Sequence, residues 1–154
     1  MTGADTAGVI ARPPLLYLGS LVAGGVFDLV FPATIPDHPL RLPVAALLVI
    51  AGAALLVTCA LRFKAAGTNV PTNMPTTALV ISGPYRFSRN PIYLALTLIY
   101  LGLAFGYGSA WPLVLLLPLL IVMRYGVIGR EERYLEAKFG EAYRAYRSSV
   151  RRWI

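Results

Sequence analysis

Four apolar stretches dominate the hydropathy pattern of this chain. They cover residues 15–31, 42–61, 92–107 and 111–128, and two of them are short. A helix rises about 1.5 Å per residue, so stretches of this length cross the roughly 30 Å hydrocarbon core of a bilayer. The pattern predicts an all-α membrane protein, a bundle of about four transmembrane helices.

The segments between these stretches contain residues that end helices. Three prolines in residues 32–39 prevent the first helix from continuing, and we expect a compact reversal there. Residues 108–110 alone separate the third stretch from the fourth, which predicts a tight antiparallel hairpin. In the long loop between the second and third stretches, residues 67–77 are rich in Pro, Thr and Asn and do not favour a regular helix.

The C-terminal tail shows a different periodicity. Residues 130–147 are charged, but Leu135, Phe139, Tyr143 and Tyr146 recur at helical spacing. This pattern predicts one amphipathic helix that lies against the membrane face or on the bundle. We expect residues 1–154 to form a single integral membrane domain.

Composition supports the membrane interpretation and excludes some partners. Hydrophobic residues make up 57% of the chain and charged residues 14%, which is too apolar for a water-soluble domain of this size. The net charge of +7 is typical of loops that face anionic lipid, so we expect the bilayer as a partner and no nucleic acid. The single cysteine, Cys59, and the single histidine, His38, cannot form a His/Cys metal site, and no metal is expected.

The basic residues also predict an orientation. Thirteen of the fourteen Lys and Arg side chains flank the N-terminus, the long loop or the C-terminal tail, and Arg41 alone lies on the other side. By the positive-inside bias, both termini and the active site are expected on the cytoplasmic face, in a bacterial inner membrane.

Two segments carry most of the candidate chemistry. SGPYRFSRNPIY, residues 82–93, opens the third stretch, and GREERYL, residues 129–135, follows the fourth, with FGEAY at 139–143. In order and spacing they resemble the isoprenylcysteine carboxyl methyltransferase and phospholipid methyltransferase superfamily of membrane enzymes, over about residues 79–154. The resemblance implies a cofactor-binding half that holds S-adenosyl-L-methionine beside the C-terminal helix. It also implies a lipid-side opening for a lipophilic methyl acceptor, which is isoprenylcysteine carboxylate-like, a phospholipid amine or another hydrophobic small molecule.

Two positions depart from the family's usual pattern. Asn90 stands where histidine is usual, and Ala95 where glycine is frequent. Asparagine still donates and accepts hydrogen bonds, but it does not titrate near neutrality, so the sequence gives no proton-transfer role to this position.

The resemblance and the residue chemistry together give a set of candidate site residues. Arg89, Glu131 and Glu132 are the expected catalytic residues: arginine binds a carboxylate through two hydrogen bonds, and a glutamate accepts hydrogen bonds or takes a proton from an amine acceptor. Tyrosine faces suit adenine and a sulfonium cation. The expected cofactor-binding residues are Tyr85, Arg89, Asn90, Pro91, Tyr93, Glu131, Glu132 and Tyr143.

Each of these residues also has an ordinary structural interpretation. Asn90 and Pro91 are good N-cap and N1 residues of a helix. Arg89 is placed to extend its charge toward the membrane surface. Glu131 and Glu132 are placed to form a solvated pair bonded to neighbouring basic residues, and tyrosines are common at membrane interfaces.

Two classes of function therefore stay open. The first is an S-adenosylmethionine-dependent membrane methyltransferase, and the second is a non-catalytic small membrane transport or assembly subunit. Transporters more often carry charges within their spans, and here only Asp28 lies within a span, near its end. Cofactor binding distinguishes the two classes.

Overall fold

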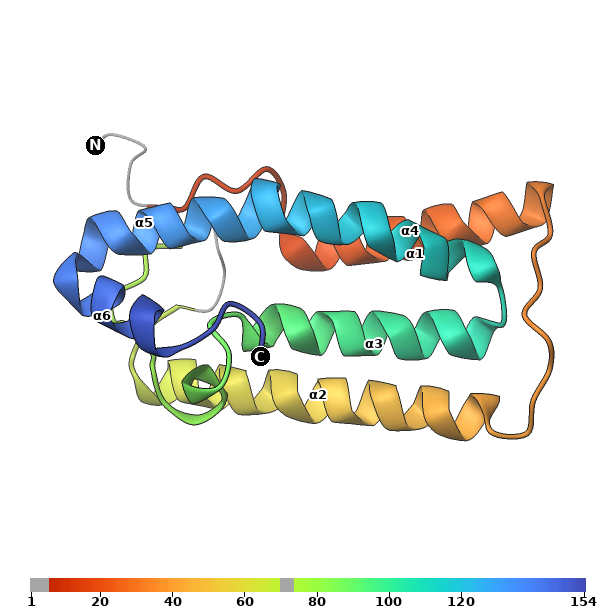
Figure 1. Ribbon diagram of the computed structural model, residues 1–154, viewed down its shortest axis with the longest axis horizontal. Coiled ribbons are helices and arrows are strands. Elements are labelled where there is room, and N and C mark those ends of the chain that lie inside the picture. Colours follow the sequence, from red (N-terminus) through yellow and green to blue (C-terminus); the bar gives the residue numbers. More distant parts are fainter. Residues whose placement is uncertain (1–5, 70–73) are drawn as a thin grey trace.

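The computed structural model describes residues 6–69 and 74–154, and the described chain is built from helices (Figure 1). Four of the segments are the apolar helices that the hydropathy pattern predicts, so the all-α membrane bundle is confirmed. The elements in chain order are α1 Pro13–Val30, α2 Arg41–Ala65, the 3-10 turn η1 Gly83–Arg86, α3 Pro91–Tyr107, α4 Ala110–Val122, the π-helix η2 Met123–Ile128, α5 Gly129–Phe139 and α6 Glu141–Ser149.

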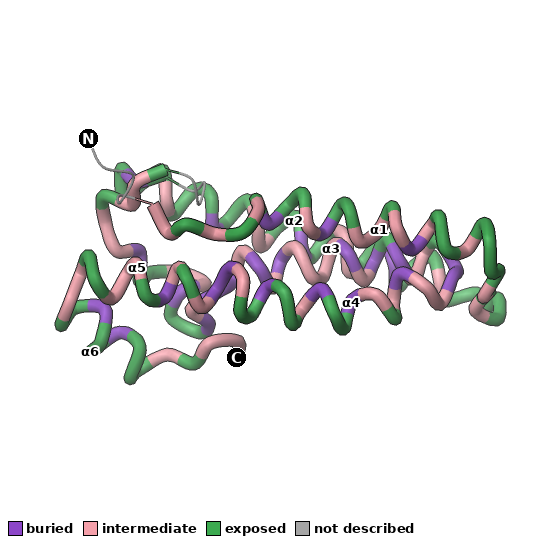
Figure 2. Tube along the Cα trace, turned by 90° about the horizontal axis from the view of Figure 1, so that it is seen from above, coloured by how far each residue is buried: buried purple, intermediate pink, exposed green. Residues whose placement is uncertain are grey.

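The outer surface of the bundle is apolar. Among the described residues, α1, α2 and the continuous helix Ala110–Phe139 are long and apolar enough to cross a membrane, and α3 is a shorter apolar helix. Leu29, Leu47 and Leu117 are 80%, 66% and 67% exposed, and Figure 2 shows exposed residues along the outer turns of the long helices. Apolar side chains on this scale face lipid, because water does not favour so large an apolar surface. The chain is an integral membrane protein.

Small residues bring the helices together in two pairs, α2 with α3 and α1 with α4. A Cβ atom on Gly52 would lie 2.7 Å from the carbonyl oxygen of Ala95, and one on Gly102 would lie 2.6 Å from a carbonyl of α2. A Cβ atom on Gly24 would lie 2.8 Å from Cγ of Pro112 in α4. In a membrane, such close backbone approach supplies the packing that the hydrophobic effect supplies in water.

The connection between α1 and α2 differs from the expected compact reversal. Residues 32–39 extend across one end of the bundle, because α1 and α2 belong to different helix pairs (Figure 1). The α3–α4 turn anchors this connection: Ile35 N–H donates to the Gly108 carbonyl at 2.8 Å, and Ala110 N–H donates to the Ala33 carbonyl at 2.8 Å. The predicted tight α3–α4 hairpin is confirmed.

The tail also differs from the prediction of one helix. α5 continues the fourth transmembrane helix, and the chain then turns at Gly140, whose φ of +52° favours glycine. α6 returns toward the bundle, so Leu135 and Phe139 of α5 pack in one cluster with Tyr143 and Tyr146 of α6. The helical spacing of these four residues therefore comes from two helices, α5 and α6, that pack on the same apolar cluster.

The remaining turns lie at the end of the bundle opposite to the 32–39 connection and the α3–α4 turn. The end of α2, the segment before α3, and α5 with α6 lie on the left of Figure 1, and the chain enters α1 from the same side. This is the end that holds the basic residues and both sequence motifs. Residues 70–73 of the Pro/Thr/Asn-rich loop lie outside the described residues.

Candidate active site

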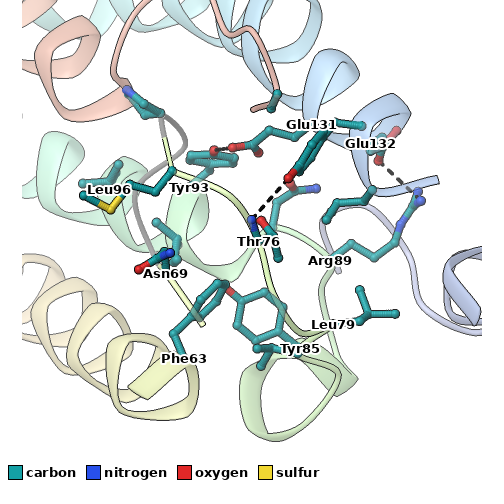
Figure 3. A pocket seen from close by; sticks show the side chains of 18 of the residues that line it. Phe63, Asn69, Thr76, Leu79, Tyr85, Arg89, Tyr93, Leu96, Glu131 and Glu132 are labelled. Atoms are coloured by element: carbon teal, nitrogen blue, oxygen red, sulfur yellow. Dashed lines mark hydrogen bonds and ion pairs between the residues drawn. The ribbon is translucent and has the colours of Figure 1, made fainter. Parts of the chain in front are cut away.

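A cavity of about 660 Å³ lies at the basic end of the bundle. Its walls come from the start of α1, the end of α2, the loop before η1, the start of α3, α5 and α6 (Figure 3). Most of the lining is apolar, and a few polar groups converge on it, which is the usual construction of a small-molecule site.

The cavity collects most of the residues that the sequence singled out. Seven of the eight expected cofactor-binding residues line it, and they come from segments more than a third of the chain apart: Tyr85, Arg89, Asn90, Tyr93, Glu131, Glu132 and Tyr143. Pro91 does not line it, because this residue is fully buried as the first residue of α3.

The start of α3 is built by its backbone and not by the Asn90 side chain. Asn90 stands at the N-cap position and Pro91 at N1, as expected, but the Asn90 side chain makes no capping hydrogen bond. Its Nδ2 donates instead to the Arg152 carbonyl at 3.0 Å, and its backbone N–H donates to Ser88 Oγ at 3.1 Å. Asn90 therefore ties the start of α3 to the C-terminal tail.

Arg89 is the least satisfied polar residue of the cavity wall. Its side chain is 10% exposed, which excludes the interpretation of a charge extended to the membrane surface. Nη1 lies 3.4 Å from Glu132 Oε1, within ion-pair distance, yet neither Nε nor Nη1 has a hydrogen-bond partner in the described part of the chain. Each buried donor without a partner costs about 1–3 kcal/mol. These donors are available to an acceptor that enters the cavity.

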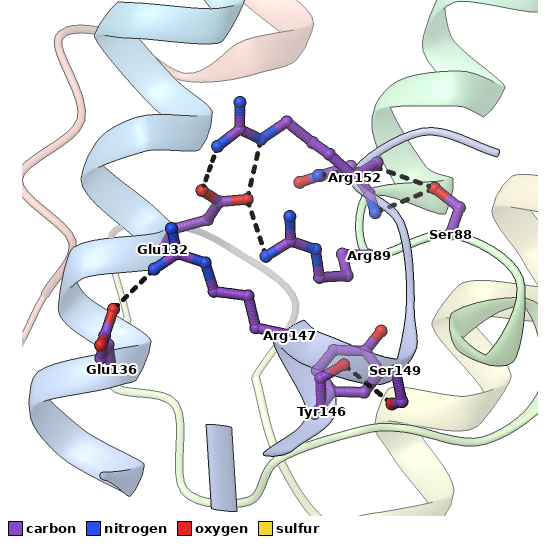
Figure 4. Close-up of polar contacts among 9 residues, drawn as sticks. Ser88, Arg89, Glu132, Glu136, Tyr146, Arg147, Ser149 and Arg152 are labelled. Atoms are coloured by element: carbon purple, nitrogen blue, oxygen red, sulfur yellow. Dashed lines mark hydrogen bonds and ion pairs between the residues drawn. The ribbon is translucent and has the colours of Figure 1, made fainter. Parts of the chain in front are cut away.

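Glu132 is neutralised by two arginines (Figure 4). Arg152 Nε donates to Oε1 at 3.0 Å, and Arg152 Nη2 donates to Oε2 at 2.6 Å. Arg89 Nη1 also lies beside Oε1, at 3.4 Å. No sequence pattern predicted this role for Arg152, which counted only as one basic residue of the tail. It follows α6, where helical periodicity carries no information about partners.

Glu131 has a different environment from its neighbour. Its Oε1 accepts a hydrogen bond from Tyr93 Oη at 2.6 Å, and no cation is paired with it among the described residues. The two glutamates thus do not form the solvated pair with neighbouring basic side chains that the sequence also allowed. One carboxylate is held by two guanidinium groups, and the other lines the cavity with a tyrosine hydroxyl as its partner.

Tyrosines form much of the remaining wall. Tyr85 is buried and its ring packs edge-on against Phe63 at 5.6 Å, and Tyr146 Oη donates to the Tyr85 carbonyl at 2.7 Å. Burial is the main cause that raises the pKa of Tyr85 and also of Tyr143 above the usual range. Both phenols therefore stay neutral and can donate hydrogen bonds at physiological pH.

The loop before η1 closes one side of the cavity. Thr68 Oγ1 accepts hydrogen bonds from the backbone N–H groups of Thr77, at 2.8 Å, and Ala78, at 3.3 Å, so the two ends of the loop are joined. Asn69 and Thr76 line the cavity from this loop. The sequence marked this segment only as irregular.

The comparisons with known proteins give the family. The model of the phospholipid methyltransferase family matches residues 40–142, about two thirds of the chain. The chain belongs to the phospholipid methyltransferase family. An uncharacterized protein of Haemophilus influenzae is 40% identical over 63 residues, which are 41% of this chain and all of that protein. No solved structure matches the chain significantly.

Family membership and fold agree. A membrane methyltransferase needs a polar pocket at the membrane surface that is open to apolar molecules, and the 660 Å³ cavity at the basic end has this character. This member of the phospholipid methyltransferase family is a membrane methyltransferase, and its family indicates a lipid-associated substrate.

Proposed function

We propose that the protein transfers a methyl group from S-adenosyl-L-methionine to a lipophilic acceptor at this cavity. The observation that carries the proposal is the polar pattern of the wall: the cavity is lined by Arg89, which has two donors without partners, and by Glu131, which has no cationic partner among the described residues. An amino-acid ligand with a carboxylate and a nearby cationic group has the complementary pattern.

The residues present fit this cofactor. Arg89 would donate to its carboxylate from Nε or from Nη1, which are otherwise buried donors without a partner in the described part of the chain. Tyr85, Tyr93 and Tyr143 offer aromatic faces to the adenine ring and the sulfonium. When bound, S-adenosyl-L-methionine supplies an electrophilic methyl group.

The acceptor side of the cavity is apolar. Pro14, Leu15, Leu56, Ile92 and Leu96 line it where α1 faces the α2–α3 pair, and Leu15 is also 59% exposed on the outer surface. These residues give a hydrocarbon tail a continuous apolar surface from the lipid to the cavity. The chain holds the acceptor by desolvation and alignment, which supply much of the rate in a displacement reaction.

Among lipophilic acceptors, we propose a phospholipid amine first. An amine arrives protonated at neutral pH, and it must lose a proton before its lone pair can react. Glu131 is placed to take this proton, because its negative charge is not neutralised by an arginine. An isoprenylcysteine carboxylate needs no such base, so the requirement for Glu131 separates the two acceptor classes.

We also propose that the site faces the cytoplasm of a bacterial cell, across the inner membrane. The end of the bundle that carries the cavity also carries thirteen of the fourteen basic residues, which supports this orientation by the positive-inside bias.

Equilibrium binding tests the cofactor assignment. Purified protein in detergent or in lipid discs is titrated with S-adenosylhomocysteine by calorimetry, and saturable binding at one site per chain is expected. Absence of saturable binding in every lipid condition would contradict the proposal and favour a non-catalytic transport or assembly subunit.

A further inference from the structure

The C-terminal tail after α6 is bonded to the wall of the proposed site. The Arg89 N–H donates to the Arg151 carbonyl at 3.0 Å, and Ser88 Oγ and Asn90 Nδ2 both donate to the Arg152 carbonyl, at 3.2 and 3.0 Å. Three consecutive residues before α3 are thus fixed to two consecutive carbonyls of the tail. The family match ends at residue 142, so the family does not assign a role to this segment.

Arg152 also connects this wall to α5. Its guanidinium donates to both oxygens of Glu132, with hydrogen bonds of 3.0 and 2.6 Å (Figure 4). The neighbouring Trp153 packs on the main apolar core. A bidentate arginine–carboxylate ion pair of this kind is directional and is one of the stronger charged interactions. Arg89 reaches the same carboxylate at 3.4 Å and gains no hydrogen bond from it at Nη1.

Arg89 and Arg152 compete for the carboxylate of Glu132. One carboxylate cannot give its best hydrogen bonds to two guanidinium groups, and Arg152 holds them. If Arg152 were absent, Glu132 would be free to turn its oxygens to Arg89 and to accept from a donor that now has no partner. The local charge of two arginines and one glutamate would then fall from +1 to zero, and the cavity would lose its attraction for an anion.

We propose that Arg152 is a positioning residue that occupies Glu132 and thereby keeps the Arg89 donors available for the carboxylate of the methyl donor. The proposal rests on the function proposed above. Arg152 touches neither donor nor acceptor, and it acts through Glu132.

The test compares ligands with and without a carboxylate. S-adenosylhomocysteine has one, whereas 5′-methylthioadenosine keeps the adenosine and the sulfur but lacks the amino-acid part. In Arg152→Gln, affinity for S-adenosylhomocysteine should fall about tenfold or more, with affinity for 5′-methylthioadenosine within about twofold of the parent. In turnover, the same variant should raise KM for the methyl donor more than it lowers kcat.

A second variant distinguishes positioning from a structural role. In the double variant Glu132→Gln with Arg152→Gln, the carboxylate that would capture Arg89 is absent, so affinity for S-adenosylhomocysteine should recover relative to Arg152→Gln alone. A structural role predicts further loss instead. Arg151→Gln is the matched control, because it removes the same charge from the adjacent, exposed side chain and should bind as the parent does.

The outcomes separate the two proposals. If the parent does not bind S-adenosylhomocysteine, the proposed function fails. If the parent binds it, three results would each overturn the role of Arg152: unchanged affinity in Arg152→Gln, equal loss for both ligands, or no recovery in the double variant. The double variant decides the question even if 5′-methylthioadenosine binds too weakly to measure.

Discussion

Replacing Arg89 by lysine should separate binding from stability. The guanidinium is 10% exposed, and its Nε and Nη1 lack hydrogen-bond partners among the described residues. Lysine keeps the positive charge beside Glu132 but removes the planar guanidinium with its fixed N–H directions. Loss of one charged hydrogen bond to a carboxylate costs about 1.5–3 kcal/mol, which weakens binding of S-adenosylhomocysteine about 10- to 150-fold.

The free energy of unfolding of Arg89→Lys should rise or stay unchanged. The parent carries two buried donors without partners, each at a cost of about 1–3 kcal/mol, and Arg89→Lys removes them. Residues shaped for a ligand are often suboptimal for stability in this way. Thermal unfolding in detergent should therefore show no decrease in melting temperature.

Calorimetric titration and thermal unfolding are measured on the same preparations. Arg86→Lys is the control, since Arg86 lies three residues earlier in η1 with an exposed side chain. If Arg89→Lys binds within about threefold of the parent, Arg89 does not hold the carboxylate. If affinity and melting temperature fall together, Arg89 is a structural residue.

Three further perturbations test the site, the packing and the orientation. Glu131→Gln should lower kcat about 100-fold with a phospholipid amine as acceptor, because the proton acceptor is lost, and parent-like turnover would remove Glu131 from this role. Gly52→Ala places a methyl group 2.7 Å from a carbonyl oxygen of α3 and should lower the free energy of unfolding by about 1–3 kcal/mol. Gly19→Ala, where the added methyl group meets open space, should not lower it. Equal melting temperatures for the two variants would show that the helices can separate at no cost. In sealed cells, cysteines introduced by Asp37→Cys and Glu141→Cys should be labelled from opposite sides, and labelling of both from one side would refute the predicted topology.

The sequence predicted the elements well because lipid imposes a simple rule on them. A bilayer requires long apolar helices, and the stretch 42–61 corresponds to α2 at Arg41–Ala65. The stretch 111–128 was also found, but the π-helical turn at its end and the continuation into α5 were not. Hydropathy reports where a chain meets lipid, and it does not report the hydrogen-bond pattern inside a helix.

The sequence predicted residues that the fold brings to one cavity, but it did not predict their separate contacts. Glu131 and Glu132 are equivalent in the sequence, and only the fold gives one of them to Tyr93 and the other to Arg152. Asn90 was predicted as a possible cap or ligand, and its amide instead binds the tail. These contacts join residues 20 to 62 positions apart, and no local pattern encodes them.

Methyl transfer into lipid is the most direct test of the proposed activity. The purified protein in lipid discs that contain an amine-bearing phospholipid is incubated with S-adenosyl-L-methionine carrying a labelled methyl group, and the lipid phase is extracted and counted. Label should accumulate in the lipid with the parent and with Arg86→Lys, and should fall strongly with Arg89→Lys. Equal labelling by the parent and by Arg89→Lys, or no labelled lipid with any acceptor offered, would contradict an active site at this cavity.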